Sequence, residues 1–142
     1  ALRDWGHARD YVEGMWRMLQ QPEGDDYILA TGVSHTVRTF VETAFRHVGR
    51  VIVWEGHDLT EVGRDAVSGK VLVRCDGRHL RPAEVSALIG DASKAKARLG
   101  WTPSTSFEDL VEEMMVHDMR LAGFSNFTSR APSKRSGTLE SA

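Results

Sequence analysis

Two charged side chains flank a proline in the sequence Arg81-Pro82-Ala83-Glu84. A guanidinium binds phosphate through paired hydrogen bonds, and a carboxylate accepts hydrogen bonds from hydroxyls. Because Pro82 restricts the backbone between them, both side chains can be directed at one ligand that carries a phosphate and a sugar, such as a nucleotide sugar. The competing interpretation is a solvated Arg and Glu pair at i,i+3, which contributes little to stability. The surrounding sequence is needed to choose between the ligand-binding and the surface-pair interpretations.

The elements that precede this segment alternate between helix and strand patterns. Apolar residues at three- and four-residue spacing predict an amphipathic helix over residues 7–20, and a short apolar run predicts a buried strand over residues 26–30. Thr36 is placed to cap a second helix that ends near Gly49, and a strand over residues 51–54 follows. This order predicts a strand, helix, strand unit.

The second half of the chain predicts a hairpin and two more helices. A turn at Ser68-Gly69 precedes a returning strand over residues 70–74. A short helical pattern follows over residues 93–99. Thr105 and Glu108 then have the spacing of a capping box at the start of the last helix.

These elements together predict an α/β fold with a small mixed sheet, a β-hairpin and three to four helices. We expect residues 1–122 to form one domain. Over residues 123–142, Ser, Thr, Pro, Lys and Arg replace the apolar periodicity, which predicts a loosely ordered tail.

The composition argues against several classes of function. The 18 Lys and Arg nearly balance the 20 Asp and Glu, and no basic run is interleaved with aromatics, which argues against nucleic-acid binding. We expect neither a membrane span nor a secretory signal, because no apolar run approaches about 18 residues. The single cysteine, Cys75, is expected to be a small core or strand residue and excludes an intramolecular disulfide, which favours a reducing compartment such as the cytoplasm.

The histidines do not have the spacing of a metal site. They are scattered, without an HExxH motif or paired Cys and His. The six are His7, His35, His47, His57, His79 and His117. We expect no metal.

Several short segments, each weak by itself, carry a family resemblance through their order and separation. They are Arg3-Asp4-Trp5-Gly6-His7-Ala8, Asp10-Tyr11-Val12, Leu29-Ala30-Thr31-Gly32, His35-Thr36-Val37-Arg38, Gly69-Lys70-Val71-Leu72-Val73, Arg81-Pro82 with Glu84-Val85, Gly90-Asp91, Lys94-Ala95 and Leu99-Gly100-Trp101. From Arg3 to about Ala122, the sequence resembles the GDP-mannose 4,6-dehydratase family, an extended branch of the short-chain dehydrogenase/reductase superfamily.

The resemblance implies that this chain is the C-terminal, nucleotide-sugar-binding part of a Rossmann-type, NAD(P)-binding enzyme. It implies a cytoplasmic, homo-oligomeric lyase. That enzyme oxidises C4 of GDP-mannose with NADP, eliminates water across C5 and C6, and returns the hydride to C6. The product is GDP-4-keto-6-deoxymannose, on the route to GDP-fucose.

The resemblance also implies roles for three residues. Arg3 and Arg81 contact the diphosphate, and Glu84 accepts hydrogen bonds from the nucleotide ribose. The chemistry is consistent with this, because two guanidiniums match a pyrophosphate in charge and geometry. Asp4 and Trp5, in contrast, are expected to be structural.

The sequence lacks the superfamily's cofactor and catalytic motifs. No glycines are arranged as G-x-x-G-x-x-G. Four residues after Tyr11 and Tyr27 come Met15 and Thr31, where the family pattern has Lys. We therefore expect no catalytic or cofactor-binding residue in this chain, which alone would be inactive, and expect an N-terminal domain outside it to bind NADP.

Two alternatives stay open on the sequence. One is a non-catalytic module that binds nucleotide sugars or another protein. The other is part of a related nucleotide-sugar reductase or epimerase.

Overall fold

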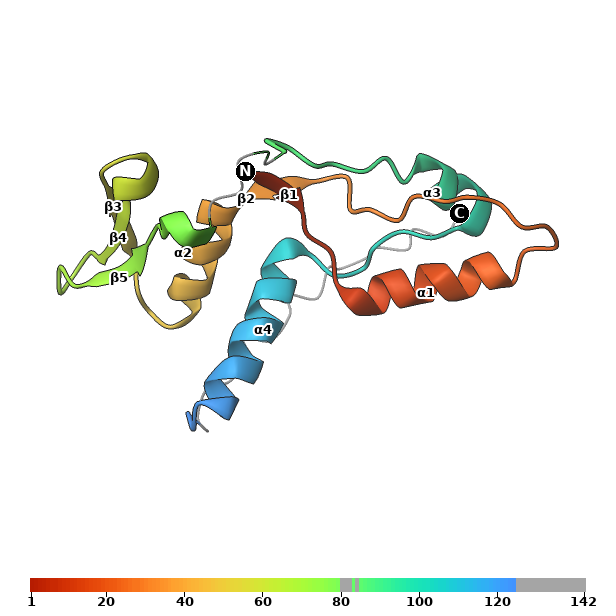
Figure 1. Ribbon diagram of the computed structural model, residues 1–142. Coiled ribbons are helices and arrows are strands. Elements are labelled where there is room, and N and C mark those ends of the chain that lie inside the picture. Colours follow the sequence, from red (N-terminus) through yellow and green to blue (C-terminus); the bar gives the residue numbers. More distant parts are fainter. Residues whose placement is uncertain (80–82, 84, 125–142) are drawn as a thin grey trace, which may run out of the picture.

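The computed structural model describes residues 1–79, 83 and 85–124, which contain two sheets and four α-helices (Figure 1). The strands are β1 (Leu2–Asp4), β2 (Ser34–Thr36), β3 (Ile52–Glu55), β4 (Val62–Asp65) and β5 (Val71–Arg74). The α-helices are α1 (Ala8–Leu19), α2 (Val37–His47), α3 (Ser93–Leu99) and α4 (Phe107–Leu121), and two short 3-10 turns lie at Asp58–Thr60 and Gly77–His79. The predicted tail lies outside the described residues from residue 125 onward.

β1 contacts a neighbouring segment on each side. It pairs antiparallel with β2 on one side. On the other side Leu2 forms a parallel bridge with Ala87, with Leu2 N donating to Ser86 O at 2.9 Å and Leu88 N donating to Leu2 O at 3.1 Å. Both sheets of the described residues are antiparallel, so the parallel character predicted for a mixed sheet is limited to this isolated bridge, which connects the start of the chain to the segment that follows residue 84.

The predicted hairpin is also confirmed. β3, β4 and β5 form an antiparallel meander in which β4 is central. Gly69 adopts a positive φ of 68° at the tip, a conformation that favours glycine in tight turns. The side chain of Asp65 accepts hydrogen bonds from Ser68 N and Oγ and from Arg50, and so fixes the turn.

The predicted strand over residues 26–30 is wrong. The segment has no regular secondary structure, and among the described residues the backbone groups of residues 27–30 have no backbone hydrogen-bond partner. The strand, helix, strand unit is wrong too, because β3 pairs with β4 and Ile52 lies opposite Asp65. A parallel strand needs a neighbouring strand, and no described residue supplies one.

The helices α2 and α4 pack against each other around aromatic rings. Thr36 caps α2 as predicted, since its Oγ1 accepts a hydrogen bond from Thr39 N at 2.9 Å. The Phe40 ring lies 5.0 Å from Trp5 and 6.0 Å from Phe107. The apolar face of α2 is thus covered by the chain before α1 and by the start of α4.

The cap of α4 differs from the prediction by one residue. Ser106, not Thr105, is the N-cap, and its Oγ accepts a hydrogen bond from Asp109 N at 3.1 Å. The physical reason is a long-range contact: Thr105 N donates to the side chain of Asp10 at 2.9 Å, which holds Thr105 outside the helix.

A buried apolar cluster joins α1 to the region around α3. Ala95, Leu99 and Trp101 are buried, and Gly100 ends α3 with a φ of 61°. The partly buried residues packed against this cluster are Tyr11, Met18, Tyr27, Leu29 and Ala92. Gly14 permits close approach here, because a Cβ at that position would lie 2.7 Å from Leu29 Cδ1.

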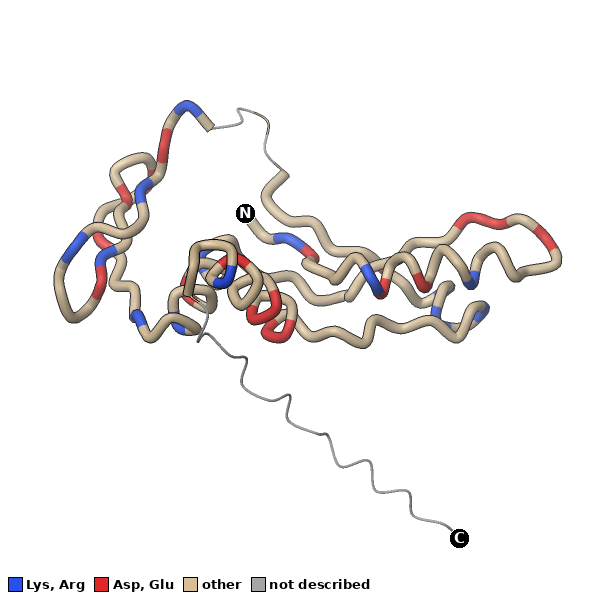
Figure 2. The backbone as a smooth tube through the Cα atoms, turned by 90° about the horizontal axis from the view of Figure 1, so that it is seen from below, with Lys and Arg blue, Asp and Glu red and all other residues tan. Residues whose placement is uncertain are grey.

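The surface carries both signs of charge. Figure 2 shows basic and acidic residues interspersed along the described backbone, with acidic residues gathered at the turn that follows α1. Among the described residues, no helix is both long enough and apolar enough to cross a membrane. Cys75 is exposed and lies just after β5, so the expectation of a core or strand position for it is wrong.

Candidate functional site

Arg3 lies on β1, where its side chain reaches the segment before Ser86. Its Nη1 donates to Leu2 O at 2.7 Å and to Val85 O at 3.0 Å. Val85 directly follows Glu84 in the sequence. The structure thus brings Arg3, separated from Glu84 by most of the chain, to the neighbour of that residue.

Arg81 and Glu84, the other two residues predicted to bind substrate, lie outside the described residues. The segment that contains them is joined to β1 on its C-terminal side, through Val85 and the backbone bonds of Ser86 and Leu88. Of the three residues predicted to bind substrate, Arg3 lies within the described part of the chain.

Asp4, the residue after Arg3, holds three segments together, as its structural assignment predicts. Its Oδ1 accepts hydrogen bonds from Thr31 N at 2.9 Å and Thr31 Oγ1 at 2.6 Å, and its Oδ2 accepts from Gly32 N at 2.9 Å and Gly90 N at 3.3 Å. Burial raises the pKa of Asp4, but the hydrogen bonds outweigh burial and hold the pKa below its ordinary value. The ionised carboxylate therefore fixes the residues around Arg3.

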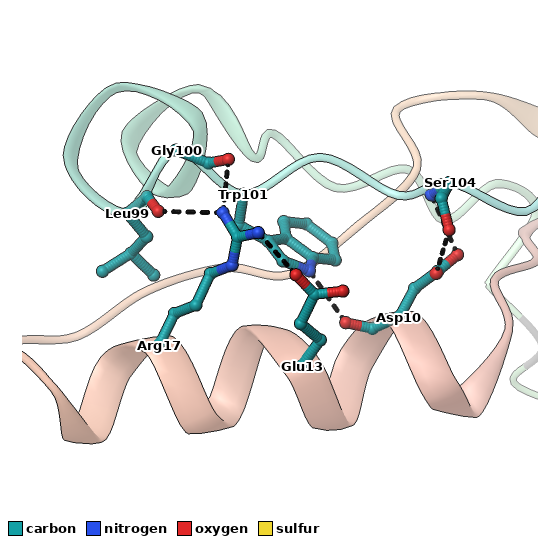
Figure 3. Close-up of polar contacts among 7 residues, drawn as sticks. All are labelled: Asp10, Glu13, Arg17, Leu99, Gly100, Trp101 and Ser104. Carbon is teal, nitrogen blue, oxygen red and sulfur yellow. Dashed lines mark hydrogen bonds and ion pairs between the residues drawn. The ribbon is translucent and has the colours of Figure 1, made fainter.

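Asp10 holds separate segments together in the same way on α1, and Figure 3 shows its contacts with Trp101 and Ser104. The sequence does not reveal this role. Its buried side chain accepts hydrogen bonds from Ser104 N and Oγ and from Thr105 N at 2.7–3.1 Å. Its backbone carbonyl accepts from Trp101 Nε1 at 2.8 Å. Burial raises the pKa of Asp10, but these hydrogen bonds lower it below its ordinary value.

Arg17 makes a second polar connection between α1 and the end of α3. Figure 3 shows its guanidinium between Glu13 and two backbone carbonyls. Nη1 donates to Leu99 O at 3.2 Å and to Gly100 O at 2.6 Å, and Nη2 pairs with Glu13 at 2.5 Å. Arg17 therefore stabilises the helix end with its charge and holds α1 in place.

A cavity of about 290 Å³ adjoins the sheet that carries Arg3. Trp5, Val33, His35 and Phe107 form its walls, and His35 is the register partner of Arg3. The His35 ring stacks on Phe107 at 3.9 Å. The buried Nε1 of Trp5 has no hydrogen-bond partner among the described residues.

The described part of the site combines a cation on β1 with a carboxylate that positions the backbone. Arg3 offers a cation beside the chain segment of Glu84, and Asp4 serves to position the backbone. Among the described residues, no group of three or more His, Cys, Asp or Glu side chains is arranged to hold a metal ion.

Comparison with protein families identifies the chain. The family model described as GDP-mannose 4,6 dehydratase matches residues 1–114. The chain belongs to the GDP-mannose 4,6-dehydratase family. Arg3, Asp4 and Asp10 all lie within the matched residues.

Curated members of the GDP-mannose 4,6-dehydratase family from distant organisms are similar to this chain. The GDP-mannose 4,6 dehydratase of Homo sapiens is 53% identical over 121 residues, which are 85% of this chain and 32% of that protein. The enzyme of Sinorhizobium fredii is 54% identical over 119 residues, 84% of this chain and 34% of that protein. The chain therefore spans about a third of the length of the relatives that it matches.

A solved structure supports the fold. The enzyme WbmG of Bordetella bronchiseptica, in complex with NAD and UDP, matches 92% of this chain and 36% of its own chain with a TM-score of 0.59 and 18% identity. At this identity the likeness concerns the fold, and it confirms the predicted α/β class.

Proposed function

We propose that this chain provides the nucleotide-sugar-binding part of a GDP-mannose 4,6-dehydratase, a lyase that converts GDP-mannose to GDP-4-keto-6-deoxymannose. The observation that carries the proposal is family membership over residues 1–114, with identities of 53–54% to dehydratases of two distant organisms. In this proposal the chain binds and orients the substrate, and the remainder of the enzyme performs the chemistry.

Arg3, Arg81 and Glu84 are the residues that we assign to the substrate. The contact of Arg3 with Val85 O supports this grouping, because it joins β1 to the chain segment of Glu84. Two guanidiniums neutralise a diphosphate, and a carboxylate accepts hydrogen bonds from the vicinal hydroxyls of the ribose. Asp4 acts as a positioning residue for Arg3 through its hydrogen bonds to Thr31, Gly32 and Gly90.

NADP is the cofactor in this proposal, and it supplies hydride transfer when bound. The sequence has no G-x-x-G-x-x-G turn and no Tyr-x-x-x-Lys pair, so the residues of this chain do not fit NADP binding. We assign NADP to the part of the family's length that this chain does not match, and we expect this chain alone to be inactive. The proposed enzyme is cytoplasmic, homo-oligomeric and part of GDP-fucose synthesis.

The test is calorimetric titration with GDP-mannose. It uses this chain and a chimera in which this chain replaces the matched region of the Sinorhizobium fredii relative. We expect Arg81→Ala and Arg3→Ala each to weaken binding by about 10- to 100-fold, since each removes a charged hydrogen bond to phosphate. Arg64→Ala is the matched control, because Arg64 pairs with Glu55 on the hairpin and is not assigned to the ligand.

Thermal unfolding of each variant separates a binding defect from loss of fold. Unchanged affinity in both Arg81→Ala and Arg3→Ala would contradict the assignment. Titration with GDP and with mannose 1-phosphate shows which portion of the ligand these residues contact.

A further inference from the structure

The sheet of β3, β4 and β5 lies at one end of the molecule, next to α2 and away from α1 and α3 (Figure 1). We call these three strands the hairpin sheet. Its last strand, β5, ends at Arg74, and the chain then continues toward Arg81 and Glu84. The position of the hairpin sheet therefore sets where the chain enters the segment that contains these two residues.

Arg38, in the first turn of α2, contacts the hairpin sheet in two ways. Its guanidinium lies 4.8 Å from the centre of the Trp54 ring on β3, which is a cation–π contact. Its Nη2 also donates to Oε1 of Glu61, the residue before β4. Trp54 is held in turn by α2, because its Nε1 donates to Glu42 Oε1 at 2.7 Å. We call these four residues the Arg38 cluster.

The contacts of Arg38 depend on its guanidinium. A guanidinium plane stacks on a ring while its N–H groups pair with a carboxylate, whereas a lysine ammonium binds as a point charge. The Glu61 side chain is 20% exposed and Trp54 is partly buried, so water screens these contacts less than it screens an open surface pair. The Arg38 cluster therefore fixes the hairpin sheet on α2.

Glu61 also connects the Arg38 cluster to the end of β5. Its backbone oxygen accepts a hydrogen bond from Cys75 N at 3.3 Å. Gly77 lies against the same turn, since a Cβ at this position would lie 3.6 Å from Leu59 Cδ1. The chain that leaves the hairpin sheet is therefore held against the turn that precedes β4.

The helix that carries Arg38 is also joined to the strand that carries Arg3. β2 ends at Thr36 and α2 begins at Val37, and β2 pairs with β1 in a register that places His35 opposite Arg3. Arg38 thus lies two residues after the strand that pairs with β1. It connects the sheet of β1 and β2 with the hairpin sheet.

We propose that Arg38 is a positioning residue for substrate binding. It fixes the hairpin sheet relative to β1, and so sets the separation between Arg3 and the chain that leads to Arg81. The inference rests on the proposed function, which assigns Arg3, Arg81 and Glu84 to the ligand. Groups that hold one diphosphate from two segments need a fixed separation, because a misplacement of about 1 Å can lower a rate about 100-fold. Arg38 acts through these segments and does not touch the ligand.

The first experiment measures order at the end of the hairpin sheet without any ligand. Cys75 is the single cysteine of the chain and is exposed, so a nitroxide spin label on it reports local motion by electron paramagnetic resonance. We expect Arg38→Gln to raise the mobility of the label. Arg38→Lys should raise it less, because lysine keeps the charge that pairs with Glu61.

Arg46→Gln is the matched control for this measurement. Arg46 lies on the same helix, and its exposed side chain has no hydrogen-bond or ion-pair partner among the described residues. The control should leave the label as immobile as it is in the unmodified chain. Equal mobility in Arg38→Gln and Arg46→Gln would overturn the inference.

The second experiment measures the kinetics of the chimera with the Sinorhizobium fredii relative. We expect Arg38→Gln to raise KM for GDP-mannose by about 10-fold and to change kcat by no more than about 2-fold, because it displaces binding groups only. Arg38→Lys should recover part of the loss, and Arg46→Gln should match the unmodified chimera. A merely structural defect lowers the fraction of active enzyme, which lowers kcat and leaves KM unchanged. That result would contradict a positioning role.

A double-substitution cycle tests whether Arg38 acts through Glu61. Arg38→Gln and Glu61→Gln should each raise KM, and the two together should raise it little more than either alone, because both remove the same contact. Effects that multiply in the double variant would show that Arg38 does not act through Glu61.

The unmodified chimera separates this inference from the proposed function. If it neither binds nor converts GDP-mannose, the proposed function fails, and the positioning role fails with it. If it binds GDP-mannose and the Arg38→Gln variant binds it equally well, the positioning role alone fails.

Discussion

The helices α1 and α2 have similar apolar spacing, yet they bury different sides. On α2, Phe40 packs between Trp5 and Phe107, so its apolar face is covered within the described chain. On α1, hydrogen bonds of Asp10 and Arg17 and the packing of Tyr11 and Met18 against the buried cluster hold the helix. The large apolar side chains on its other side are exposed, namely Val12, Met15, Trp16 and Leu19. Amphipathic spacing therefore predicts a helix, but it does not predict which segment of the chain covers the apolar face of that helix.

The largest expected effect comes from comparing two Trp→Ala substitutions, one in the buried cluster that packs against α1 and one on the exposed side of α1. Trp101 is 1% exposed and donates to Asp10 O, so Trp101→Ala should destabilise the chain by about 3–5 kcal/mol. Trp16→Ala should change the free energy of unfolding by no more than about 0.5 kcal/mol, because Trp16 is exposed. Urea unfolding of the two variants measures both values. Similar losses of stability would contradict the claim that only one side of α1 is packed.

The second effect tests the polar side of α1. Asp10→Asn removes the negative charge and one of the two oxygens that accept hydrogen bonds from Ser104 and Thr105, and should cost about 2 kcal/mol because hydrogen bonds to a charged group are the stronger ones. Asp26→Asn is the control, since Asp26 is exposed. A variant at Asp10 as stable as this control would show that the network does not hold α1.

The pH dependence of stability should follow from the same carboxylates. The pKa values of Asp4 and Asp10 are lowered from 3.8 in the folded chain, so the unfolded chain binds more protons as the pH falls. Their stabilisation is therefore complete well above pH 3.8 and is lost as the pH falls through the lower, folded pKa values.

Urea midpoints measured from about pH 6 down to about pH 3 test this direction. The loss of stability on acidification should be smaller in Asp4→Asn and in Asp10→Asn than in the unmodified chain. An identical slope in all three proteins would show that neither carboxylate titrates differently on folding.

The smallest effect is expected on the hairpin. Arg64 pairs with Glu55 at 2.7 Å, and both side chains are exposed. Arg64→Ala should therefore change stability by about 0.5 kcal/mol or less, because water and salt screen such pairs. A loss of several kcal/mol would mean that the hairpin depends on polar contacts as strongly as α1 does.

Local signals predicted much of the fold from the sequence. The Thr36 cap and the Ser68-Gly69 turn depend on residues near in sequence, and both are found in the structure. The strand over residues 26–30 was predicted from its apolar run, but no described residue pairs with it. The cap of α4 shifted by one residue because Asp10, distant in sequence, binds Thr105.

The site was predictable only in part for the same reason. Residue chemistry and family resemblance indicated Arg3, and the structure adds its contact with Val85. The positioning roles of Asp4 and Asp10 depend on hydrogen bonds to distant residues, which spacing along the chain does not reveal. The roles of Arg81 and Glu84 stay predictions.

The most direct test of the account is the dehydratase activity of the chimera with NADP and GDP-mannose. The account predicts that the chimera forms the 4-keto-6-deoxy product, that Arg81→Ala lowers its rate at limiting substrate by about 10- to 100-fold, and that Arg64→Ala does not. A folded chimera that forms no product, or one that is equally active with Arg81→Ala, would contradict the claim that this chain supplies the substrate-binding part of the enzyme.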